Sequence, residues 1–137
     1  MQKHKVQAFL DAWSEDVLGT KPIFLTLQQD LTQKGEAEIE FHERPGISYS
    51  LRGIHQGRKE RPLFVMIDVI DEDPKQRWLS VCFYGDMIED PDELGDLIPE
   101  GLLGEDGYCF DVDESEERLV QYIRMRIEEA YQKACNG

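Results

Sequence analysis

The stretch Leu63-Phe64-Val65-Met66-Ile67-Asp68-Val69-Ile70 is an almost unbroken run of apolar residues. Its length and its β-branched side chains are typical of a central strand that is covered on both faces. After a turn at 71–74, the alternation over 78–84 predicts the next strand. Before the run, residues 38–42 and 47–52 alternate around Pro45-Gly46, which predicts a hairpin with one solvated face.

Segments with helical periodicity lie before and after these strands in the sequence. Apolar residues recur on one face of a helix from Val6 to Val17, and again in a second helix from Ile23 to Leu31. A long helix over 114–135 is predicted by its inner stripe, with Asp113 as the capping residue. That stripe consists of Leu119, Tyr122, Ile123, Ile127, Ala130, Tyr131 and Ala134.

The segment Asp90-Pro91-Asp92-Glu93 has the pattern of a helix start, with a capping carboxylate, a proline in the first position and a glutamate in the third. It predicts a short helix that buries Leu94, Leu97 and Ile98 and ends at Pro99. A short strand over 108–112 would follow it.

The order of these elements predicts an α+β fold. We expect a mainly antiparallel sheet of about five strands, with an N-terminal helix pair and a long C-terminal helix covering one face. The 137 residues form a single domain, 1–137. Within it we expect the helix pair at 1–35, antiparallel strands at 36–84, an acidic helix-loop-strand segment at 86–117 and the C-terminal helix at 114–135.

The acidity of the chain is concentrated in one segment. The whole sequence has 29 Asp and Glu against 15 Lys and Arg, a formal net charge of -14, which argues against binding to nucleic acid or to an anionic membrane. Fourteen of the carboxylates and no Lys or Arg lie in 86–117. They either stabilise helix starts and keep the surface solvated, or form a docking surface for a basic protein. For the second interpretation, the candidate partner-binding residues at exposed turns are Asp92, Asp96, Glu105 and Asp106.

A basic stretch lies outside the acidic segment, just before the central strand. It consists of Arg52, His55, Arg58, Lys59 and Arg61. These residues either keep a hairpin tip soluble or complement the acidic segment of a second copy of the chain.

Neither a catalytic motif nor a cofactor or metal motif is present. His4, His42 and His55 are far apart, and the EF-hand spacing fails because Glu116 stands where the loop needs glycine. A Mg²⁺ or Ca²⁺ site without the EF-hand spacing remains an alternative. Cys82, Cys109 and Cys135 have no close spacing, so we expect reduced thiols in a cytoplasmic protein without a signal peptide or membrane span.

The sequence therefore favours a non-enzymatic interaction module, and two alternatives remain. One is a small-ligand-binding or hydrolase-like domain with an apolar cleft between the sheet and the first helix pair, lined by Trp13, Tyr49 and Trp78. The other is an inhibitor or immunity-type protein that mimics the charge of DNA.

The order of motifs over residues 40–134 resembles small bacterial α+β domains of the YjbR/MmcQ and YdhG kind. The resemblance is carried by the strands at 61–67 and 78–81, the acidic start at 90–94, a glycine-rich loop and the closing helix that ends Glu129-Ala130-Tyr131. It implies an α+β fold and a cytoplasmic location. Those domains are suspected of binding DNA, but here Cys82-Phe83 and Gly107-Tyr108 replace their lysine and their His-Trp pair. No DNA-binding role or site residue is therefore carried over.

Overall fold

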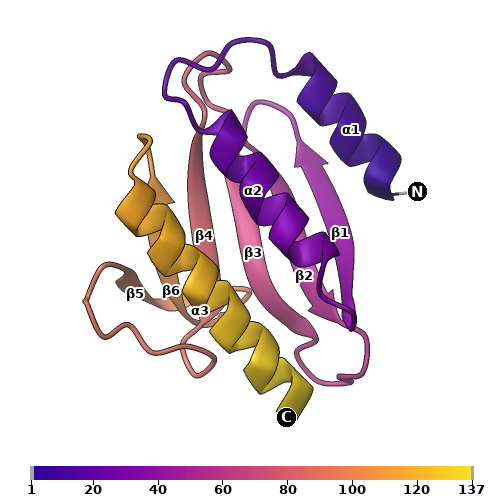
Figure 1. The fold of residues 1–137 in the computed structure, drawn as a ribbon, viewed down its shortest axis with the longest axis vertical. Coiled ribbons are helices and arrows are strands. Elements are labelled where there is room, and N and C mark those ends of the chain that lie inside the picture. The colour runs from indigo at the N-terminus through magenta and orange to yellow at the C-terminus, as the bar shows by residue number, and fades with distance from the viewer. Residues whose placement is uncertain (1, 137) are drawn as a thin grey trace.

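Three helices pack on one face of a six-stranded antiparallel sheet in the computed structural model, which describes residues 2–136 (Figure 1). The helices are α1 (Gln2–Ala12), α2 (Lys21–Thr32) and α3 (Glu117–Asn136). The strands are β1 (Ala37–Arg44), β2 (Ser48–His55), β3 (Leu63–Ile70), β4 (Trp78–Tyr84), β5 (Asp96–Leu102) and β6 (Glu105–Val112). The predicted α+β class and the helix-covered face are confirmed, with six strands rather than about five.

The sheet has the strand order β1-β2-β3-β4-β6-β5, so β6 pairs with both β4 and β5. Strand β5 pairs with β6 only, so β5 is an edge strand although β6 follows it in the sequence. Helix α3 crosses over β3, and α2 lies between α3 and α1 (Figure 1). The core lies between these helices and the sheet, and its stripe on α3 consists of Val120, Ile123, Ile127, Ala130, Tyr131 and Ala134.

The prediction that β3 is covered on both faces is wrong, because the helices pack on one face of the sheet only. The apolar run has a different cause at its start, where the register of β2 against β3 shifts after Gly53. Phe64 and Val65 both approach Gly53 there, and a Cβ on Gly53 would lie 2.8 Å from Phe64 and 2.9 Å from Val65. This β-bulge places two consecutive apolar side chains against one glycine, which removes the need for alternation.

The helix predicted from Asp90 to Pro99 does not form. Glu93 has φ +54, a left-handed conformation that ends a right-handed helix. The Asp90 carboxylate instead closes a loop by accepting the N–H groups of Leu94 at 3.1 Å and Gly95 at 2.8 Å. Residues 96–102 become β5, whose edge position tolerates Pro99. Leu97 and Ile98, expected to be buried, are 52% and 42% exposed.

Two other predicted boundaries move. Helix α1 ends at Ala12 rather than near Val17, which is 68% exposed. Helix α3 begins at Glu117, so Asp113 does not cap it. Within residues 2–136, no helix combines the length and the apolar character that crossing a bilayer requires.

Two of the three cysteines are not free thiols, contrary to the prediction. Cys82 on β4 and Cys109 on β6 are directly opposite in the register and form a disulfide, with their Cα atoms 4.1 Å apart. Cys135 is free and exposed. The pairing could not be read from the sequence because the two residues are 27 positions apart on strands that are not consecutive.

Candidate functional site

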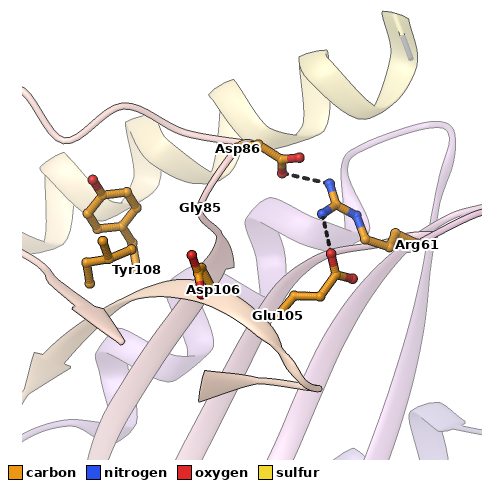
Figure 2. A pocket seen from close by; sticks show the side chains of 7 residues that line it. Arg61, Gly85, Asp86, Glu105, Asp106 and Tyr108 are labelled. Atoms are coloured by element: carbon orange, nitrogen blue, oxygen red, sulfur yellow. Dashed lines mark hydrogen bonds and ion pairs between the residues drawn. The ribbon is translucent and has the colours of Figure 1, made fainter. Parts of the chain in front are cut away.

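An acidic pocket of about 430 Å³ opens beside the start of β6 (Figure 2). Its polar residues are Arg61 and three carboxylates, those of Asp86, Glu105 and Asp106. Leu97 and Tyr108 form its apolar wall. We refer to this cavity as the acidic pocket.

Loops at one end of the sheet position these side chains. Arg61 precedes β3, and Asp86 follows β4 in a tight turn. Glu105 and Asp106 are the first residues of β6, after a turn at Leu103-Gly104 in which both residues have positive φ. The Gly85 N–H donates to the Asp106 carbonyl at 2.9 Å, which joins the turn after β4 to the start of β6.

A guanidinium already occupies one side of the pocket. Arg61 donates to Asp86 at 2.6 Å and to Glu105 at 3.0 Å, as the dashed lines in Figure 2 show. Its guanidinium carbon also lies 4.3 Å from the centroid of the Tyr84 ring. Burial acts against the charge of Arg61, but the hydrogen bonds to the two carboxylates raise its pKa above the ordinary value.

The pocket nevertheless keeps an excess of negative charge. Its three carboxylates face one guanidinium, which leaves a formal excess of two negative charges. Asp106 accepts a hydrogen bond from the Glu100 N–H at 3.0 Å. This backbone donor has no formal charge, so it does not neutralise the Asp106 carboxylate. The pocket therefore has room and charge for a further cation.

The four partner-binding residues predicted from the sequence do not form one site. Glu105 and Asp106 lie together in the acidic pocket. Asp92 lines a separate groove beside α3, and its N–H donates to the Tyr122 hydroxyl at 3.3 Å. Asp96 is opposite Cys109 on the edge strand.

The sequence did not indicate the other five residues that line the pocket, which are Arg61, Gly85, Asp86, Leu97 and Tyr108. Arg61 lies 25 residues from Asp86 and 44 from Glu105, so no local pattern could connect them. In the sequence, Arg61 belongs to a basic stretch that could complement the acidic segment of a second copy of the chain. In the structure it pairs with the acidic segment of its own chain.

The predicted apolar cleft is not assembled. Trp13 is 1% exposed and packs against Phe9, whose ring also stacks on Tyr49 at 4.2 Å between centroids. Trp78 lies opposite Ile70 on the face of the sheet that the helices do not cover. The structure thus separates Trp78 from Trp13 and Tyr49. Among residues 2–136, no group of three His, Cys, Asp or Glu side chains is arranged to hold a metal ion.

The loop that carries Asp86 is hydrogen-bonded to α3. The Asp90 carboxylate accepts a hydrogen bond from the Tyr122 hydroxyl, and the Glu89 N–H donates to the Glu129 carboxylate at 3.0 Å. Met87 and Ile88 are buried beneath it. Glu89 and Asp90 therefore hold the loop after Asp86 against α3.

Asp90→Asn is expected to lower the free energy of unfolding by about 1–2 kcal/mol at pH 7, because three donors lose a charged acceptor. Burial alone would raise the pKa of Asp90, but Tyr122, the two N–H groups and the charge of Arg126 hold it below the ordinary value. The stabilisation is therefore complete above the ordinary Asp pKa and fades as the pH falls below about 4. Urea unfolding of both proteins between pH 7 and pH 3 measures this. A difference that stays constant over that range would contradict it.

Comparison of the chain with family models, with curated proteins and with solved structures found no match. The chemistry of the acidic pocket is accordingly the basis on which a function is proposed.

Proposed function

We propose that this chain is a non-enzymatic interaction module that binds a basic protein partner through the acidic pocket. The excess of two negative charges in a 430 Å³ pocket is the observation that carries the proposal. A lysine or arginine of the partner would enter beside Arg61, where Asp106 makes no ion pair with any other residue of 2–136. The stem of that side chain would pack on Leu97 and Tyr108, since long basic side chains bury their methylenes along apolar surfaces.

The surroundings of the pocket support a protein rather than a free small cation as the occupant. Leu97, Ile98 and Leu103 expose 52%, 42% and 59% of their surface around the turn between β5 and β6. Exposed apolar side chains next to charge complementarity are typical of protein interfaces. The partner's contact segment is therefore expected to alternate basic and apolar residues.

A labelled Arg-Leu-Arg-Leu peptide tests the proposal. The double variant Glu105→Gln, Asp106→Asn keeps the shape of the pocket and removes its excess charge, so the peptide should bind about tenfold more weakly at 50 mM salt. Fluorescence anisotropy measures the affinity. Near 0.5 M salt, where the Debye length is about 4–5 Å, the two proteins should bind almost equally weakly.

The matched control is Asp113→Asn, Glu114→Gln, which removes two charges from exposed residues of the same acidic segment outside the pocket. It should change the affinity by less than about twofold. An equal loss in both double variants would mean that the peptide responds only to net charge, and the proposal would fail.

A further inference from the structure

Arg61 fills a place in the acidic pocket that suits a guanidinium group. Two of its nitrogen atoms donate to different carboxylates, to Asp86 at 2.6 Å and to Glu105 at 3.0 Å (Figure 2). Its guanidinium carbon lies 4.3 Å from the centroid of the Tyr84 ring. Two carboxylates and an aromatic face fit a planar cation with several N–H donors better than a compact ammonium group. We call Asp86, Glu105 and Tyr84 the guanidinium site.

The chain holds Arg61 in the guanidinium site only weakly. The side chains of Asp86 and Glu105 are 67% and 50% exposed, so water and salt screen both ion pairs. Arg61 also has φ +44, a left-handed backbone conformation that is unfavourable for residues other than glycine. Exchange of Arg61 for a guanidinium from outside would therefore cost little.

The main chain around Arg61 has few contacts that oppose its movement. Residues 59–61 make no main-chain hydrogen bond to the main chain of any other residue of 2–136, and Lys59 and Glu60 are exposed. Segments with few hydrogen bonds and little burial open at low cost. Pro62 is held, because its carbonyl accepts the His55 N–H at 2.8 Å. Movement of Arg61 out of the pocket would thus leave β3 in place.

Two other cations lie near the pocket, but neither competes for its carboxylates. Arg52 donates from Nε to the Ser50 hydroxyl at 3.1 Å. Arg58 has its Nη1 atom 3.9 Å from the Met87 sulfur. The ion pairs with carboxylates of the pocket within residues 2–136 are both made by Arg61.

We propose that Arg61 is an intramolecular competitor of the partner, and that an arginine of the partner replaces it in the guanidinium site. This inference rests on the proposed function, in which a first basic side chain enters beside Arg61 at Asp106. Residues i and i+2 of an extended segment point to the same side, about 6.6 Å apart, so a second arginine follows the first into the pocket. The guanidinium site selects arginine over lysine at this second position, because an ammonium group lacks the planar fork of donors.

Arg61→Gly tests the competition, because it empties the guanidinium site and because glycine accepts φ +44 without strain. Fluorescence anisotropy at 50 mM salt compares the labelled Arg-Leu-Arg-Leu peptide with Lys-Leu-Lys-Leu, which has the same charge. The variant should bind the arginine peptide about tenfold more tightly than the unaltered protein does, and the lysine peptide less than about threefold more tightly.

The matched control is Arg58→Gly, which removes the same charge from the same loop without emptying the guanidinium site. It should change the affinity for either peptide by less than about twofold. Equal gains in both variants, or equal gains for both peptides, would mean that only net charge matters and would overturn the inference. A peptide that binds the unaltered protein but binds Arg61→Gly no more tightly would overturn this inference alone. Peptides that bind neither protein would overturn the proposed function, and the inference with it.

A small cation tests the guanidinium site without any peptide. N-ethylguanidinium should shift the NMR signals of Tyr84 and Glu105 saturably in Arg61→Gly, and ethylammonium should not. In the unaltered protein neither ion should shift them, because Arg61 fills the site. Equal shifts with both ions in Arg61→Gly, or none with N-ethylguanidinium, would overturn the assignment of the site.

Discussion

Arg77→Met is expected to lower the free energy of unfolding by about 3–5 kcal/mol, because it leaves the charge of Asp71 buried without its partner. The two residues are 8% and 7% exposed, and Arg77 Nε donates to Asp71 Oδ1 at 2.8 Å. The other oxygen of Asp71 accepts the Gly46 N–H at 2.9 Å. This ion pair therefore joins the loop between β3 and β4 to the turn between β1 and β2.

The guanidinium of Arg77 also packs among aromatic rings. Its carbon lies 5.3 Å from the centroid of Phe9, 5.5 Å from Trp13 and 5.7 Å from Tyr49. Methionine fills part of this space but provides no charge, so the loss should remain large. Urea unfolding followed by circular dichroism measures it.

Two further variants separate the ion pair from general effects of the substitution. Arg118→Met replaces an exposed arginine and should change stability by less than about 0.5 kcal/mol. Adding Asp71→Asn to Arg77→Met should recover part of the loss, since the unpaired charge is removed. A loss below about 1 kcal/mol for Arg77→Met would show that the pair contributes little.

Replacing both Cys82 and Cys109 with alanine is expected to lower the free energy of unfolding by about 3–4 kcal/mol, because the disulfide closes a loop of 27 residues in the unfolded chain. The bond ties β4 to β6, and through β6 it holds the hairpin that carries Glu105 and Asp106. Reduction of the unaltered protein should produce a similar loss.

Urea unfolding with and without a reducing agent measures this effect. Cys135→Ala is the control, because Cys135 is exposed and outside the disulfide, and its removal should change stability by less than about 0.5 kcal/mol. A thiol titration of the unfolded, unreduced chain should find one free thiol. Three free thiols there would show that the bond does not form.

Several elements could be predicted because their signals are local. The strand at 63–70 follows from an almost unbroken apolar run rich in β-branched residues, and the strand at 78–84 follows from a period of two. Helix α3 follows from a stripe of period 3.6, and the structure buries most of that stripe as expected. These patterns depend only on residues a few positions apart.

The helix predicted at Asp90 shows where such signals fail. A carboxylate followed by proline and acids suits the start of a helix, but it also suits a loop in which the carboxylate accepts N–H groups. Tyr122 on α3, 32 residues away, donates to Asp90 and favours the loop. The competing contact is tertiary, so the local pattern could not exclude it.

The acidic pocket was predicted only in part, for a related reason. The density of carboxylates in 86–117 pointed to Glu105 and Asp106, and both line the pocket. Arg61 also lines the pocket, because β6 pairs with β4 as well as with β5. The same strand order sets Cys82 against Cys109 and Ser80 against Asp111.

The amino-acid sequence thus determines the α+β class, the individual strands and helices and the location of the acidic charge, since each depends on composition or short-range periodicity. Strand order and register decide the disulfide and the ion pairs of Arg61 and Arg77. Those contacts join residues far apart in the chain. Such pairings arise from the packing of the whole sheet against its helices, and no segment contains them alone.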